Sequence, residues 1–149
     1  MTLYKITFTI PANTPKSNPY VRKIKINEEF LQRIYIRIPY GHKATAHMHI
    51  RYGLDLFAPQ PTEIILPDGT IEKQKIEDLW IEGDNEVLDF PVHYCAPETP
   101  WEITLEGYNE SSLHDHSFYV YIVAVPKKVA LPYLIMEEFV NIFKRLIGV

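Results

Sequence analysis

Residues 34–38 read Ile34-Tyr35-Ile36-Arg37-Ile38, and nowhere else in the chain do apolar and polar side chains alternate more regularly. A period of two is the pattern of a β-strand that buries one face. The same alternation recurs on both sides of this stretch, over residues 4–10, 20–26, 44–50, 88–94 and 101–105. Twelve prolines and six glycines punctuate these runs, which is typical of an all-β domain.

The spacing of these runs predicts a single antiparallel β-sandwich or jelly-roll-like domain of about eight strands. Residues 118–125 are apolar on both faces and predict a central strand. Pro91 predicts that its own strand lies at a sheet edge or contains a bulge. The polar segment 107–115 predicts a hairpin loop, and Pro67-Asp68-Gly69 predicts a turn between two short strands.

Composition bounds the class of protein. The chain has 149 residues, 46% of them hydrophobic, so one domain with an apolar core is expected. Its formal net charge of −4 and its lack of a basic tract argue against nucleic acid as the main partner. A single cysteine, Cys95, excludes an intramolecular disulfide framework and a Cys-rich zinc module. We expect neither a signal peptide nor a membrane span, and a cytoplasmic location if the protein is not part of a virion.

The C-terminal segment departs from the period of two. We expect residues 1–126 to form the sandwich, and 127–149 to form a linker and an amphipathic helix over 131–147, with residues 129–132 as a hinge. The apolar arc of this helix is wider than the roughly 100° that a helix lying on a sheet needs. The extra apolar surface on this helix predicts an assembly interface, through which the chain forms a homo-oligomer or docks on a larger protein assembly. The interface would consist of Leu134, Ile135, Phe139, Ile142, Phe143, Leu146 and Ile147.

Four of the six histidines form two His-x-His pairs, His47/His49 and His114/His116. Side chains at i and i+2 of a strand share a face, so the first pair could reach one ion. Gly41 and the first pair also copy the opening of the cupin metal motif, but the glutamate and the second half of that motif are missing. A metal site of His47, His49 and His116 is therefore an alternative to surface histidines on a polar face.

Catalytic signatures are absent from the sequence. Cys95 and His93 are not interpreted as a Cys-His pair, because a lone cysteine at a strand end is more often a small buried side chain. Glu102 and Glu106 share the polar face of one strand and are interpreted as solvated carboxylates. The glycines are isolated, which excludes a phosphate-binding loop. Asn109-Glu110-Ser111 has the form of a glycosylation sequon. We expect a non-enzymatic protein that uses no cofactor.

Tyrosines recur at positions that alternate with inward residues, among them Tyr35 and Tyr121. Such residues are typical either of a carbohydrate-stacking face or of a protein-contact face. The wide apolar face of the C-terminal helix favours protein contact, and a carbohydrate-binding module stays an alternative.

The N-terminal third carries a resemblance. Residues 10–19 read IPANTPKSNP, and Ile24-Lys25-Ile26 and residues 34–41, IYIRIPYG, follow them. This order resembles small uncharacterised proteins encoded by tailed phages and by related viruses or proviruses of thermophilic bacteria and archaea. In those proteins the loop precedes a strand, a hydrophobic-Pro-x-Gly turn and a strand that contains His, here residues 46–50. The resemblance implies a virion-associated β-sandwich, such as a capsid decoration or spike-like subunit, and it assigns no catalytic residue.

Overall fold

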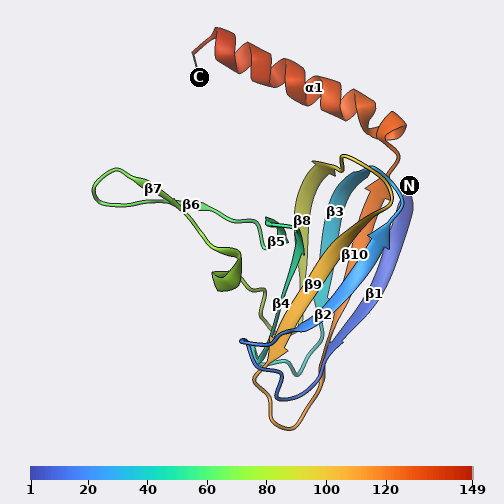
Figure 1. Ribbon diagram of the computed structural model, residues 1–149, viewed down its shortest axis with the longest axis vertical. Helices are drawn as coiled ribbons and strands as arrows, with labels where there is room; N and C mark the ends of the chain where they lie inside the picture. Colours follow the sequence, from blue (N-terminus) through green and yellow to red (C-terminus); the bar gives the residue numbers. More distant parts are fainter. Residues whose placement is uncertain (149) are drawn as a thin grey trace.

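The computed structural model describes residues 1–148, without the side chains of 129–134. Two four-stranded antiparallel sheets pack face to face, and a hairpin and a C-terminal helix project from them (Figure 1). The first sheet has the order β1 (Thr2–Ile10), β10 (His116–Val125), β3 (Phe30–Ile38) and β8 (Glu86–Cys95). The second has the order β2 (Tyr20–Ile26), β9 (Trp101–Asn109), β4 (Ala46–Tyr52) and β5 (Asp55–Ala58). The other elements are β6 (Glu63–Ile65), β7 (Ile71–Lys73), the 3₁₀ turn η1 (Ile76–Asp78) and α1 (Lys127–Leu146).

The connectivity is jelly-roll-like. Strands β1 to β4 alternate between the two sheets, and so do β8 to β10, so that neighbours within a sheet come from distant parts of the chain. Eight strands arranged in this way form two Greek keys. The fold class predicted from the alternation is confirmed.

The core lies between the two sheets. Ile34, Ile36 and Ile38 are fully buried on β3, as the period of two predicted. Ile34 and Ile36 are paired with Ile122 and Val120 of β10. The second sheet supplies the opposing side of the core, which includes Met48, Ile50, Ile103 and Leu105.

Two predictions about individual strands are confirmed. β10 is central, between β1 and β3, and β8 is an edge strand that pairs with β3 alone and shifts register near Pro91. However, only one face of β10 is covered. Phe118, Val120 and Ile122 are buried, whereas Tyr119 on the other face is exposed.

The prediction of a hairpin loop over residues 107–115 is wrong in two respects. β9 continues to Asn109, and the loop that follows it crosses to β10 in the other sheet, so it does not join paired strands. Gly107 belongs to the strand, where the side chains of Phe8 and Ile10 occupy the space that a Cβ would need. The buried Asn109 side chain donates to the carbonyl oxygens of Ile10 and His114, at 3.1 and 2.9 Å. Because this side-chain amide is buried and hydrogen-bonded within the fold, it is not accessible as a glycosylation acceptor.

The predicted hinge and the start of the helix are also wrong. α1 begins at Lys127 and runs through residues 129–132, which were expected to be a hinge. The Lys127 amide donates to the Glu29 carboxylate at 3.0 Å, and this partner from another part of the chain satisfies a free N–H of the first turn. The same bond lowers the pKa of Glu29 below its usual range.

The absence of a side chain at residue 107 can be tested. A Cβ there would collide with Ile10 and lie 2.8 Å from the His47 carbonyl oxygen. We expect Gly107→Ala to destabilise the fold by about 1–3 kcal/mol, as overpacking of a core does. Urea denaturation measures the change, and Lys23→Ala, on the exposed face of β2, is the control, expected to stay within about 0.5 kcal/mol. An unchanged midpoint for Gly107→Ala would contradict this account.

Candidate functional site

His47 and His49 lie on the outer face of the second sheet, and both are buried rather than on the surface. Their cover is a segment that we call the strap, residues 79–85. Within it Ile81 forms two backbone hydrogen bonds with Met48, at 3.0 and 2.7 Å, beside β4. Because side chains alternate along an extended segment, Trp80 and Glu82 then lie over the two histidines.

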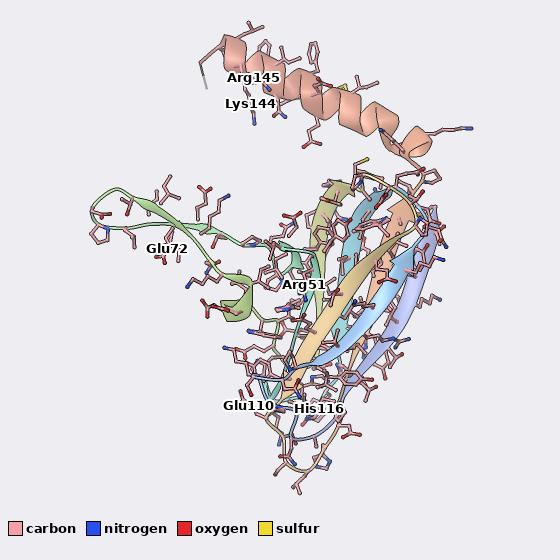
Figure 2. The ribbon with its side chains drawn as sticks, in the orientation of Figure 1. Arg51, Glu72, Glu110, His116, Lys144 and Arg145 are labelled. Atoms are coloured by element: carbon pink, nitrogen blue, oxygen red, sulfur yellow. The ribbon has the colours of Figure 1, made fainter. Side chains whose placement is uncertain are left out.

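His47 lies between two carboxylates. Its Nδ1 is 2.8 Å from the Glu82 carboxylate, and its Nε2 is 3.3 Å from that of Glu110. The imidazole stacks on Tyr108 with ring centroids 4.3 Å apart. Glu110 is labelled at the lower end of the sheet in Figure 2. His47 thus connects the strap, β9 and the loop after β9.

His49 is held in the same manner. Its Nδ1 is 3.0 Å from the Leu79 carbonyl oxygen and its Nε2 is 3.0 Å from the Glu106 carboxylate. The ring thus bridges the strap, through Leu79, and β9, through Glu106. It also stacks on Trp80, with ring centroids 4.1 Å apart.

Glu106 supplies the opposing charge. Burial acts to raise the pKa of Glu106, but hydrogen bonds from Arg51 and His49 outweigh it and hold that pKa below its ordinary value. Arg51 donates to one carboxylate oxygen through both Nε and Nη2, and His49 approaches the other. The interpretation of Glu106 as a merely solvated carboxylate is therefore wrong.

A groove of about 380 Å³ lies beside the strap, between Trp80, Leu54 and Arg51. Three of its polar lining groups form a network, in which Glu106 is bonded to both His49 and Arg51. Because His49 is also bonded to the Leu79 carbonyl oxygen, this arrangement fits a structural clamp that holds the strap on the sheet.

The predicted metal set is not brought together. His116 lies at the start of β10, in the other sheet, where its ring is 4.6 Å from that of His42. Within residues 1–148 no group of three or more His, Cys, Asp or Glu side chains is placed to hold a metal ion. His114, the partner of His116 in the motif, is exposed in the loop before β10.

The pair of His42 and His116 forms a second buried polar cluster. His42 donates from Nε2 to the Ser117 carbonyl oxygen at 2.8 Å, and its buried Nδ1 has no hydrogen-bond partner. Burial lowers the pKa of His42, and the nearby His116 lowers it further. Burial also lowers the pKa of His116. Both rings therefore favour the neutral form in the folded protein.

The apolar face predicted for the C-terminal helix is exposed. The large apolar side chains between residues 135 and 147 are 44% to 79% exposed, and no strand packs extensively against α1 (Figure 1). Figure 2 labels Lys144 and Arg145 near the C-terminal end of this helix. Of the predicted interface residues, the side chain of Leu134 lies outside the described part, and the following are exposed: Ile135, Phe139, Ile142, Phe143, Leu146 and Ile147.

Tyr35 and Tyr121 are neighbours across the β3–β10 pairing, on the outer face of the first sheet. The guanidinium carbon of Arg33 lies 6.0 Å from the centre of the Tyr35 ring. Both tyrosines are half-buried.

Sequence reasoning missed the strap. The signal was there in Leu79-Trp80-Ile81-Glu82, where an aromatic and an acidic residue flank an isoleucine, but the stretch is too short for a clear period of two. That Trp80 and Glu82 meet His49 and His47 depends on the Ile81–Met48 pairing, which joins segments far apart in the chain.

Comparisons with known proteins identify no family, since no protein-family model, curated protein or solved structure matches this chain. No helix among the described residues is long and apolar enough to cross a bilayer.

The clamp can be tested through Glu106. Glu106→Ala leaves the His49 ring and the Arg51 guanidinium without this partner, and an unmet buried group costs about 1–3 kcal/mol. We expect that loss of stability, together with faster amide exchange in residues 79–85, measured by hydrogen–deuterium exchange. The control is Glu102→Ala, the exposed glutamate on the same face of β9, which should change neither quantity. Equal exchange in both variants would rule out the clamp.

The buried imidazole of His42 predicts a pH dependence. Between pH 7.5 and 5.5 the unfolded chain takes up a proton at this residue near its ordinary pKa of about 6.5, while the folded chain resists it. Stability supplied by His42 is therefore lost as the pH falls. We expect the stability difference between wild type and His42→Gln to shrink over this window, as measured by thermal unfolding at several pH values. A difference that is constant or grows toward pH 5.5 would contradict the prediction.

Proposed function

We propose that this chain is a non-enzymatic structural subunit that assembles with copies of itself through α1. The observation that carries the proposal is the exposed apolar face of this helix. Eight large apolar side chains share it: Ile135, Met136, Phe139, Val140, Ile142, Phe143, Leu146 and Ile147.

The spacing of these side chains fits a helical bundle. Two stripes run along the helix, each with steps of four, three and four residues, which is the spacing of a coiled-coil seam. One stripe is Ile135, Phe139, Ile142 and Leu146, and the other is Met136, Val140, Phe143 and Ile147. Two adjacent seams allow one helix to contact two neighbours, so we favour a bundle of more than two chains.

Energetics and charge favour copies of the same chain as the partner. Burial contributes about 1.5–3 kcal/mol for each large apolar side chain, so covering even part of this face exceeds the cost of ordering it. The polar stripe carries Glu137 and Glu138 toward the middle of the helix and Lys144 and Arg145 in its last turn. A stripe that carries both signs of charge is complementary to itself.

The setting that we propose for this subunit is a virion, as a capsid decoration or spike-like component. The support is the resemblance of the N-terminal third to proteins of tailed phages and related viruses, together with a jelly-roll-like sandwich. Capsid proteins use that architecture, but so do lectins and cupins. The metal-binding alternative has less support, because the nitrogens of His47 and His49 face carboxylates and a carbonyl group.

The decisive variant is Phe139→Asp with Phe143→Asp, at the centre of the apolar face. Two carboxylates in the bundle core would have to be desolvated, so we expect the oligomer to give way, in dilute solution, to a monomer of 17.4 kDa. The mass is measured by light scattering, and circular dichroism should show the sandwich still folded. A chain that ends at Lys128 should also be a folded monomer in dilute solution.

The matched control is Lys144→Gln with Arg145→Gln, which changes the net charge by the same amount on the polar stripe of α1. This variant should keep the wild-type mass. If the Phe139→Asp, Phe143→Asp variant also keeps it, or if wild type is itself a monomer, assembly through α1 is refuted.

A further inference from the structure

A second element projects from the sandwich without cover. We call residues 62–74 the arm; it contains the hairpin β6–β7 and leaves the sandwich after β5 (Figure 1). The base of the arm is closed by Thr62, whose backbone amide and hydroxyl donate to the Gln74 side chain at 3.1 and 2.9 Å. Its tip is a turn in which Asp68 accepts from Thr70.

The two strands of the arm carry apolar side chains that are exposed to solvent. β6 and β7 pair only with each other, and every residue in both strands is exposed. Ile65 and Ile71 are paired across the hairpin and are 75% and 62% exposed. An isolated two-stranded hairpin is marginally stable in water, so a surface that covers this one would stabilise it.

A suitable surface is the free edge of β2. This strand pairs only with β9, so the backbone groups on its other side are open to a further strand. β2 carries Arg22, Lys23 and Lys25 and no acidic residue. The arm has the opposite balance, with three acidic residues and one basic residue: Glu63, Asp68, Glu72 and Lys73.

The other three sheet edges fit the arm less well. β8 has Pro91 and a register shift, which blunt an edge against strand addition. β5 has four residues, and Ile81 of the strap extends its side of β4. β1 carries Lys5 as its single charged residue, so it lacks the complementary charge of β2.

The arm and β2 of one chain lie on opposite sides of the sandwich. The arm follows β5 directly, and β5 and β2 are the two outer strands of the same sheet. The strap covers part of the outer face between them. We infer that the arm of one copy adds as a strand to the β2 edge of a neighbouring copy, with arm carboxylates facing Lys23 and Lys25.

This contact differs in kind from the α1 bundle. The arm and the β2 edge are different surfaces, so the interface is head-to-tail and builds rings or open filaments. It does not require α1, and it goes beyond the proposed function by naming a second interface. Backbone pairing would supply affinity, while the charges would set the partner and the register.

The contact is tested with full-length protein in which p-benzoylphenylalanine replaces Ile65, the most exposed arm side chain. Mixing ¹⁴N- and ¹⁵N-labelled chains before photolysis distinguishes adducts between chains from adducts within a chain. We expect interchain adducts on residues 20–26. Because β6 and β7 have only three residues each, the contact is small and requires concentrated protein. At high concentration the same adducts should form in the Phe139→Asp, Phe143→Asp background, so failure of the α1 proposal and failure of this one are distinguishable.

Charge reversal then tests which surfaces meet. Glu63→Lys with Glu72→Lys reverses the arm, and Lys23→Glu with Lys25→Glu reverses the edge. Either pair alone places like charges together and should reduce the interchain adduct about tenfold. An equimolar mixture of the two variants restores opposite charges at every arm–edge contact, and the adduct should return.

A matched control is Glu86→Lys with Glu138→Lys, which changes the charge as much as the arm variant does, at exposed residues of β8 and α1, outside the arm and β2. This control should keep the wild-type adduct. Adducts that map outside residues 20–26, adducts only within a chain, or a mixture that stays as low as the single variants would each overturn the inference.

Discussion

Ile34, Ile36 and Ile38 can leave water only if another apolar sheet face covers them, and the rest of the fold follows from that requirement. One sheet cannot cover itself, so the chain must return with a second sheet whose inward side chains, such as Met48 and Leu105, oppose the first. Because successive strands cross from one sheet to the other, no part of the sequence completes either sheet alone. Each crossing between the sheets requires a loop. Polar side chains hold these loops in place, as the Asn109 side chain does through its hydrogen bonds to the Ile10 and His114 carbonyl oxygens.

Three features lie outside the core: the outer face at His47 and His49, the apolar face of α1, and the arm. They differ in whether another part of the chain covers them. The outer face at His47 and His49 is covered from within, by a strap whose charges are paired. The apolar face of α1 and the hairpin arm have no cover in the single chain. The contrast between the buried His47 and His49 and the exposed Phe139 and Phe143 is the basis on which we propose contact with other chains.

Prediction succeeded where the signal is local and periodic. The inward residues of β3, the edge position of β8 around Pro91 and the turn at Asp68 all depend on neighbours in the sequence, and all were predicted correctly. It failed where the partner is remote. Gly107 belongs to a strand because Phe8 and Ile10 take the space of a side chain, and α1 begins at Lys127 because Glu29 accepts its amide. β5 was missed because four residues show no clear period.

The sequence by itself therefore determined that the chain is a β-sandwich with an apolar C-terminal helix, since hydrophobic alternation and its change of period are properties of adjacent residues. Only the tertiary structure decided which polar residues are clamped and which surfaces stay open. His47 and His49 lie on a polar face in the sequence, and they are buried because Ile81 pairs with Met48 and places Trp80 and Glu82 over them. Whether a polar strand face is buried depends on a covering segment from another part of the chain. The alternation of side chains along the strand does not indicate whether such a segment exists.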